Sequence, residues 1–152
     1  MKFRAIVDKI LSRVLIVIMG VMVINVLWQV FSRYFLGEPS SFTDELARYL
    51  MIWVGILGAA YVSGKNGHVA IDVLPSRLSK ENQKKLKNIV GILIILFSIT
   101  ALVIGGSRLV YITYVLKQFS PALQMPLSLV YLVIPISGIL IIYYKISDFL
   151  NS

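Results

Sequence analysis

Residues Trp28–Leu74 read WQVFSRYFLGEPSSFTDELARYLMIWVGILGAAYVSGKNGHVAIDVL. This stretch holds the end of one apolar run, an acidic turn, a second apolar run and the single histidine of the chain. Gly37 and Pro39 end the first run, and the Ser and Thr hydroxyls that follow are typical N-caps of a new helix. The stretch therefore predicts two apolar helices joined by a tight turn.

The whole chain has the composition of a membrane protein. It has 152 residues, of which 58 % are hydrophobic, compared with roughly 45 to 50 % in soluble domains. Four apolar runs approach the roughly 20 residues that cross a bilayer as a helix. They cover about 14–35, 42–63, 88–111 and 127–144. We predict an all-α integral membrane protein with four transmembrane helices in a single domain over residues 1–152.

Both ends of this bundle have features of their own. Residues 1–13 alternate apolar and charged positions at helical spacing, which predicts an amphipathic segment at the membrane interface. The basic segment 80–87 has no helix breaker, so we expect span 3 to be long, tilted and extended into water. Pro135 predicts a kink in span 4, because proline removes a backbone hydrogen bond.

Charge sets the expected orientation. Ten of the fifteen Lys and Arg residues lie in segments 1–13 and 64–87. By the positive-inside rule both termini and the 64–87 segment are expected in the cytoplasm. The net charge of +8 is explained by topology, so no nucleic-acid partner is expected.

The charged residues near the outer ends of spans 1 and 2 are candidates for an interface. Asp44 and Arg48 are i,i+4 and Glu45 and Arg48 are i,i+3, so they share a helix face, and Arg33 lies at the end of span 1. Two interpretations stay open: a polar contact with a partner subunit or lipid head groups, or an internal ion pair with snorkelling side chains. Asn25, in the middle of span 1, predicts an interhelical hydrogen bond.

Span 2 also carries a face of small residues. Gly55, Gly58 and Ala59 include the small-xxx-small spacing that lets membrane helices approach closely. Trp53 lies deeper than an interfacial anchor would, so we expect it to pack against protein. We count these four residues as candidate partner or lipid contacts.

The sequence offers no arrangement for catalysis. His68 and Asp72 are i,i+4, which favours a local hydrogen bond at the inner interface over a metal site. Cysteine is absent, which excludes disulfides and thiolate sites. We therefore expect no catalytic, cofactor-binding or metal-binding residues in this chain.

The block VFSRYFLGEPSSFTDELARYLMIWVGILGAAYVSGKNGHVAIDVL resembles the small, Q-type membrane subunit of tripartite ATP-independent periplasmic (TRAP) transporters. The segment SPALQMPLSLVYLVIPISGILI, Ser120–Ile141, is also similar to that family. The two stretches cover nearly half of the chain.

The resemblance implies a non-catalytic scaffold in a bacterial inner-membrane symporter for an organic acid, such as sialic acid or a dicarboxylate. Its partners would be a large M-type subunit, where sodium is expected, and a periplasmic substrate-binding protein, with membrane phospholipids around it.

Other classes of membrane protein fit less well. A four-helix multidrug exporter is expected to carry a carboxylate at mid-membrane depth, which no span has. A haem anchor needs axial ligands inside the bundle, and this chain has one loop histidine. An assembly or anchor protein for another multispan complex stays open on the physics alone.

Overall fold

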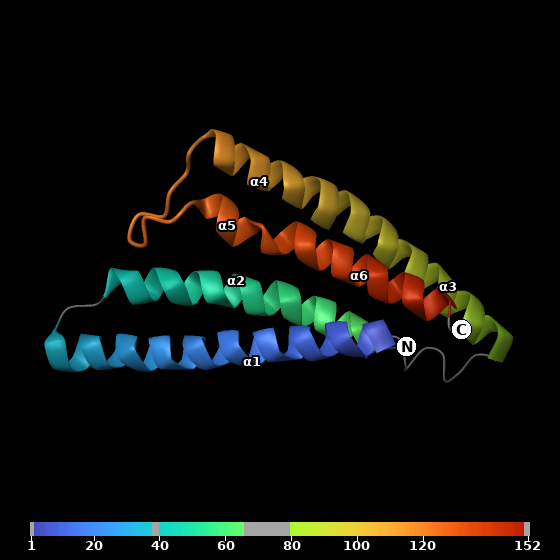
Figure 1. The fold of residues 1–152 in the computed structure, drawn as a ribbon, viewed down its shortest axis with the longest axis horizontal. Helices are drawn as coiled ribbons and strands as arrows, with labels where there is room; N and C mark the ends of the chain where they lie inside the picture. Colours follow the sequence, from blue (N-terminus) through green and yellow to red (C-terminus); the bar gives the residue numbers. More distant parts are fainter. Residues whose placement is uncertain (1, 38–39, 66–79, 151–152) are drawn as a thin grey trace.

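The computed structural model describes residues 2–37, 40–65 and 80–150, and these are almost entirely helical (Figure 1). The elements are α1 (Lys2–Phe31), η1 (Ser32–Leu36), α2 (Ser41–Gly64), α3 (Lys80–Phe97), η4 (Ser98–Gly105), α4 (Gly106–Val115), α5 (Leu127–Tyr131) and α6 (Val133–Leu150). The elements η1 and η4 are π-helical. In the described part of the chain, four helical segments are long and apolar enough to cross a membrane, over Arg4–Leu36, Ser41–Gly64, Lys85–Val115 and Leu127–Leu150. The predicted all-α fold with four spans is confirmed.

The first hairpin forms as its turn sequence predicts. Gly37 adopts a left-handed conformation, with a φ of 73°, and ends η1, which is the usual role of glycine after a helix. Ser40 then caps α2, because its side-chain oxygen accepts a hydrogen bond from the Thr43 backbone N–H at 3.4 Å.

The four spans lie mainly side by side in a single row (Figure 1). Helix α1 packs against α2, α2 packs against α6, and α6 packs against η4 and α3. One end of the row holds the start of α1 and the end of α6, and the other holds the end of η1, the start of α2 and the 116–126 loop. We call them the terminal end and the turn end.

Glycines lie at four points of close contact within the row, at Gly64, Gly91, Gly106 and Gly138. A Cβ atom at Gly64 would lie 2.7 Å from the ring of Tyr144, and one at Gly138 would lie 2.8 Å from the Cβ of Leu102. A Cβ at Gly106 would lie 2.8 Å from Ile134. Small residues of this kind let helix backbones approach in a membrane, where no hydrophobic force drives helices together.

Spans 3 and 4 depart from regular α-helix. Span 3 is continuous through the π-helical segment η4, and its 31-residue membrane candidate Lys85–Val115 is about 46 Å long at 1.5 Å per residue. That exceeds the roughly 30 Å hydrocarbon layer, so span 3 must tilt or extend beyond it. Span 4 is interrupted at Leu132, between α5 and α6. The interruption falls in the turn before Pro135, where a proline removes a hydrogen bond.

The row leaves two broad apolar faces uncovered. In the most apolar 18-residue segment of span 4, 33 % of the residues are buried, compared with 11 % in the corresponding segment of span 1. The buried core lies where α1, α2 and α6 meet, around Leu11, Leu57 and Tyr144. Lipid or another membrane protein must therefore cover most of this chain's surface.

Candidate functional site

The turn end is held together by one carboxylate. The Oε2 atom of Glu45 accepts hydrogen bonds from the backbone N–H groups of Ala122 and Leu123, at 2.7 and 3.1 Å. Its Oε1 atom accepts a hydrogen bond from the Tyr49 hydroxyl at 2.6 Å. These four residues, which we call the turn-end clamp, fix the 116–126 loop to the first turns of α2.

The 116–126 loop is itself an ordered turn. The Ser120 N–H donates to the Met125 carbonyl at 2.9 Å, and residues on either side form an isolated β-bridge. Lys117 and Gln124 have φ angles of 48° and 53°, a left-handed conformation that non-glycine residues keep only where surrounding contacts hold it. The turn-end clamp supplies such contacts, so the loop presents a defined surface.

The charged residues predicted to cluster here divide into two groups. Glu45 turns toward the loop, whereas Asp44 and Arg48 form an exposed ion pair of 2.9 Å on the outside of α2. Gln29 of α1 donates to the other oxygen of Asp44 at 3.2 Å. Arg33 is exposed and has no ion pair within the described part of the chain. An exposed pair of this kind contributes about 0 to 1 kcal/mol, so Arg33 and Arg48 remain available to a partner.

The predicted hydrogen bond from Asn25 is confirmed. Its side-chain amide is buried and donates to the backbone carbonyl of Thr43 at 2.7 Å. The bond joins α1 to the first turn of α2, where the carbonyl is shielded from water.

Trp53 contacts protein as expected. Its indole N–H donates to the carbonyl of Val130 at 3.1 Å. That carbonyl lies two residues before the interruption at Leu132, so Trp53 connects α2 to span 4 close to the break.

The small-residue face of α2 does not pack within this chain. A Cβ atom at Gly55 or Gly58 would meet no neighbouring atom within 4 Å. Gly55 and Ala59 are exposed and Gly58 is half-buried. The close contacts inside the chain are made elsewhere, at Gly64, for example. This face is therefore open to a second membrane helix or to lipid.

A second polar cluster, which the sequence patterns above do not predict, lies at the terminal end. Arg4 donates to the Oδ1 atom of Asp148 at 2.7 Å and to the backbone carbonyl of Gly64. Tyr144, which is fully buried, donates its hydroxyl to Asp8 at 2.6 Å. These five residues form the terminal-end clamp, which ties together the ends of α1, α2 and α6.

Two lysines add to the terminal-end clamp. The Nζ atom of Lys65 lies 3.9 Å from Asp8, and that of Lys145 lies 3.8 Å from Asp148. Lys145 is buried, and a buried charge is tolerated only where it is paired. Asp148 therefore compensates both Arg4 and Lys145.

One signal could have revealed this cluster. Arg4, Asp8 and Leu11 follow i, i+4, i+7 spacing, so they share one helix face. Leu11 is buried against the core, whereas Ile6 and Ile10 are exposed. Part of the apolar face of this segment thus points outward, whereas Arg4 and Asp8 turn toward α6.

The remaining candidates cannot be placed. His68 and Asp72 lie outside the described residues, so their predicted hydrogen bond stays a prediction. Among residues 2–37, 40–65 and 80–150, no group of three His, Cys, Asp or Glu side chains could hold a metal ion.

Comparison with known proteins adds an independent observation. Residues 9–152 match the family described as "Tripartite ATP-independent periplasmic transporters, DctQ component". The chain is 33 % identical to a TRAP transporter small permease protein of Haemophilus influenzae over 135 residues, which are 89 % of this chain and 82 % of that relative.

Two other relatives carry names that specify a substrate. The chain is 27 % identical to the sialic acid TRAP transporter small permease protein SiaQ of Vibrio cholerae, over 68 % of this chain and 59 % of that protein. It is 30 % identical to the isethionate TRAP transporter permease protein DctMQ of Oleidesulfovibrio alaskensis, over 62 % of this chain and 15 % of that protein.

Proposed function

This chain belongs to the family of DctQ components of the TRAP transporters, and we propose that it is the fixed scaffold beside a larger M-type membrane subunit. It is a multi-pass membrane protein, and its relatives are transporter permease subunits. In the proposed role it takes no part in chemistry and binds no cofactor. Its task is to hold the moving subunit in place within the bilayer.

The observation that carries this proposal is the open row of helices fastened at both ends. The turn-end and terminal-end clamps fix the helices where they leave the membrane, and the length between them is largely apolar and uncovered. The sequence has no Asp or Glu at mid-depth in any span, so it lacks the intramembrane acids that usually mark a proton or ion path. A braced apolar surface suits a scaffold.

The small share of the isethionate relative that this chain matches supports the proposal of a larger partner subunit. The similar segment is only 15 % of that permease protein, so there it is a small part of a much longer polypeptide. We propose that in this system the longer part is a separate large subunit and that a periplasmic substrate-binding protein supplies the cargo. The ordered 116–126 loop and the exposed Asp44–Arg48 pair are the surfaces we assign to these partners.

The cargo and the driving ion belong to the proposal as well. We propose symport of an organic acid, either sialic acid or a dicarboxylate, driven by sodium that binds in the large subunit. One relative is named for sialic acid and another for isethionate, and both of these are organic acids. From the positive-inside rule we propose that the terminal end lies in the cytoplasm and the turn end in the periplasm of a bacterial inner membrane.

Co-expression and reconstitution test the scaffold. We expect this chain to co-purify in a one-to-one complex with a large multispan subunit, and sodium-driven uptake in proteoliposomes to need both. If the large subunit alone took up substrate as fast as the two chains together, the scaffold role would be contradicted. A stable complex with a multispan protein that transports nothing would favour the alternative, an assembly or anchor protein.

A further inference from the structure

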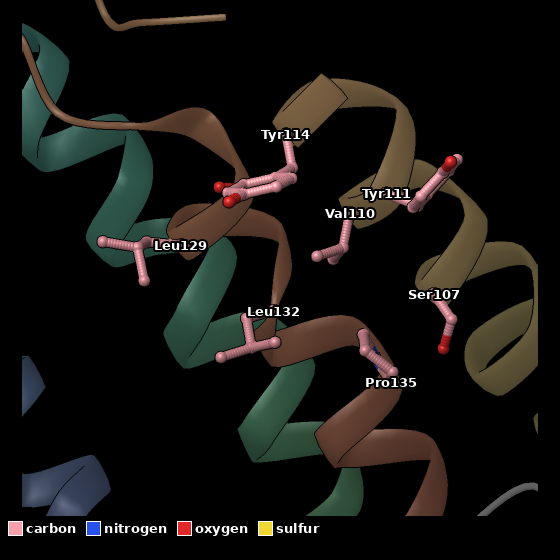
Figure 2. Close-up of a pocket in the computed structure, with 8 residues that line it drawn as sticks. Ser107, Val110, Tyr111, Tyr114, Leu129, Leu132 and Pro135 are labelled. Atoms are coloured by element: carbon pink, nitrogen blue, oxygen red, sulfur yellow. The ribbon is translucent and has the colours of Figure 1, made fainter. Parts of the chain in front are cut away.

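A pair of exposed cations lies on the outer side of α1. Lys9 and Arg13 are exposed and one helical turn apart. The groove of about 360 Å³ between α4 and α5 differs from this place, since none of its lining residues, Val110 and Leu132 among them, is charged (Figure 2). The groove therefore favours no particular ligand, whereas the pair on α1 selects for negative charge.

Lys9 and Arg13 lie on the side of α1 that faces away from the row. Leu11 is buried in the core, and the two cations are each two positions from it. Two positions correspond to about 200° around an α-helix, so both cations lie opposite the packed face. Because α1 is the edge helix of the row and packs on α2 (Figure 1), this side is open to the surroundings.

No carboxylate in the described part of the chain neutralises the pair. Asp8 is next to Lys9 in sequence, but it turns toward the core and accepts a hydrogen bond from Tyr144 at 2.6 Å. Neither Lys9 nor Arg13 forms an ion pair with any residue that the structure describes. Like charges four positions apart on a helix repel each other, so an anion bound between them would stabilise this end of α1.

The depth of the pair matches the headgroup layer of a bilayer. No Asp, Glu, Lys, Arg or His occurs between Arg13 and Arg33. The two arginines are about 30 Å apart along the helix at 1.5 Å per residue, which equals the thickness of the hydrocarbon layer. Arg13 therefore lies at the boundary of that layer. Lys9 is about 6 Å farther out, within a headgroup region that is roughly 5 to 8 Å thick on each side.

Exposed apolar surface continues from the pair toward the membrane centre. Ile16 and Val17 are 67 % and 63 % exposed and lie about one turn deeper than Arg13 on the same side of α1. A Cβ atom at Gly20, another turn on, would meet no atom within 4 Å. We call Lys9, Arg13 and these three residues the basic edge. Its order, cations first and apolar surface below, is the order of headgroup and acyl chain in a phospholipid.

We propose that the basic edge binds an anionic phospholipid, with the phosphate between Lys9 and Arg13 and one acyl chain along the apolar residues below them. Ammonium and guanidinium groups form strong, charge-assisted hydrogen bonds with phosphate, and basic residues beside a span attract anionic headgroups. An acidic segment of another protein would need no match to the hydrocarbon boundary, so the depth of the pair favours a lipid. This site goes beyond the scaffold role and does not depend on it.

Native mass spectrometry of the full chain in detergent, titrated with palmitoyl-oleoyl phosphatidylglycerol, tests the site. We expect one tightly retained lipid per chain and much weaker retention of the zwitterionic palmitoyl-oleoyl phosphatidylcholine. Lys9→Gln and Arg13→Gln should each weaken binding of the anionic lipid about fivefold, and the double variant about twentyfold, because each cation near the surface adds to the attraction. Arg13→Lys keeps the charge and should retain most of the binding.

The matched control is Arg33→Gln, at the other boundary of the same uncharged stretch. Arg33 is also exposed and unpaired in the described part of the chain, but Gly37 ends its helix one turn later, where a second cation would have to lie. Its variant should leave binding of the lipid unchanged.

Each other result overturns the site. Equal retention of phosphatidylcholine would show that the headgroup charge is not recognised, and unchanged binding in the double variant would remove Lys9 and Arg13 from the site. A loss in Arg33→Gln as large as in the double variant would mean non-specific attraction to positive charge. If no lipid is retained but the double variant releases a large membrane subunit, the cations pair with an acidic protein segment instead. Thermal melting of each variant checks that it folds.

Discussion

The hydrogen bond between Tyr144 and Asp8 offers the sharpest test of how the row is held together. Tyr144→Phe removes a 2.6 Å bond from a fully buried phenol to a carboxylate and leaves the ring in place. Bonds to charged groups contribute about 1.5 to 3 kcal/mol, whereas hydrogen bonds between membrane helices average about 0.6 kcal/mol. The acceptor here is a carboxylate and the donor is fully buried, so we expect a loss near 2 kcal/mol.

A double-mutant cycle with Asp8→Asn measures this bond. Unfolding of the full chain is followed by circular dichroism as denaturing detergent is added, for both single variants and the double variant. We expect a coupling energy above about 1 kcal/mol, since the two residues are in direct contact. Tyr111→Phe, at a tyrosine that is 67 % exposed, is the control and should change little. A coupling energy within about 0.3 kcal/mol of zero would refute the terminal-end clamp as a stabilising unit.

Three further changes test other parts of the row. Glu45→Ala should speed hydrogen exchange of backbone amides in the 116–126 loop at least tenfold, because two of these amides lose their acceptor. Unchanged exchange would show that the loop keeps its structure without Glu45. Gly138→Ala should lower thermal stability by about 1 to 3 kcal/mol through overpacking. Gly55→Ala is the control and should leave stability unchanged, because a Cβ atom there meets no atom within 4 Å. Trp53→Phe should cost about 1 kcal/mol in the same melting assay, and no loss would mean that its indole bond is dispensable.

Much of the fold could be predicted because its signals are local. A glycine and a proline followed by hydroxyl side chains predict where span 1 ends and α2 begins, and Ser40 caps that helix as expected. Asn25 could be assigned an interhelical bond because a membrane amide has no water to bond with. Pro135 predicted the interruption of span 4 by the hydrogen bond it cannot make.

The contacts between spans could not be predicted in the same way. A helix that is apolar all round gives no periodic signal of which face packs inward, because lipid solvates every face equally well. The amphipathic pattern of segment 1–13 therefore does not indicate that Arg4 and Asp8 turn toward α6. Asp44 and Glu45 are neighbours in sequence, yet Glu45 bonds to the 116–126 loop, more than 70 residues along the chain, while Asp44 pairs with Arg48.

The row itself explains why the polar contacts lie at its ends. A compact bundle can bury polar side chains at its centre, whereas in a single layer of helices most side chains midway along a span lie on an uncovered face. Charged groups at mid-depth would be costly there, so the strong contacts collect where helices leave the membrane. Between the two clamps the helices are held by close packing at Gly138 and Gly106. The described helices are thus linked by polar contacts at both ends and expose apolar surface between them, which would suit the proposed scaffold role beside a larger subunit.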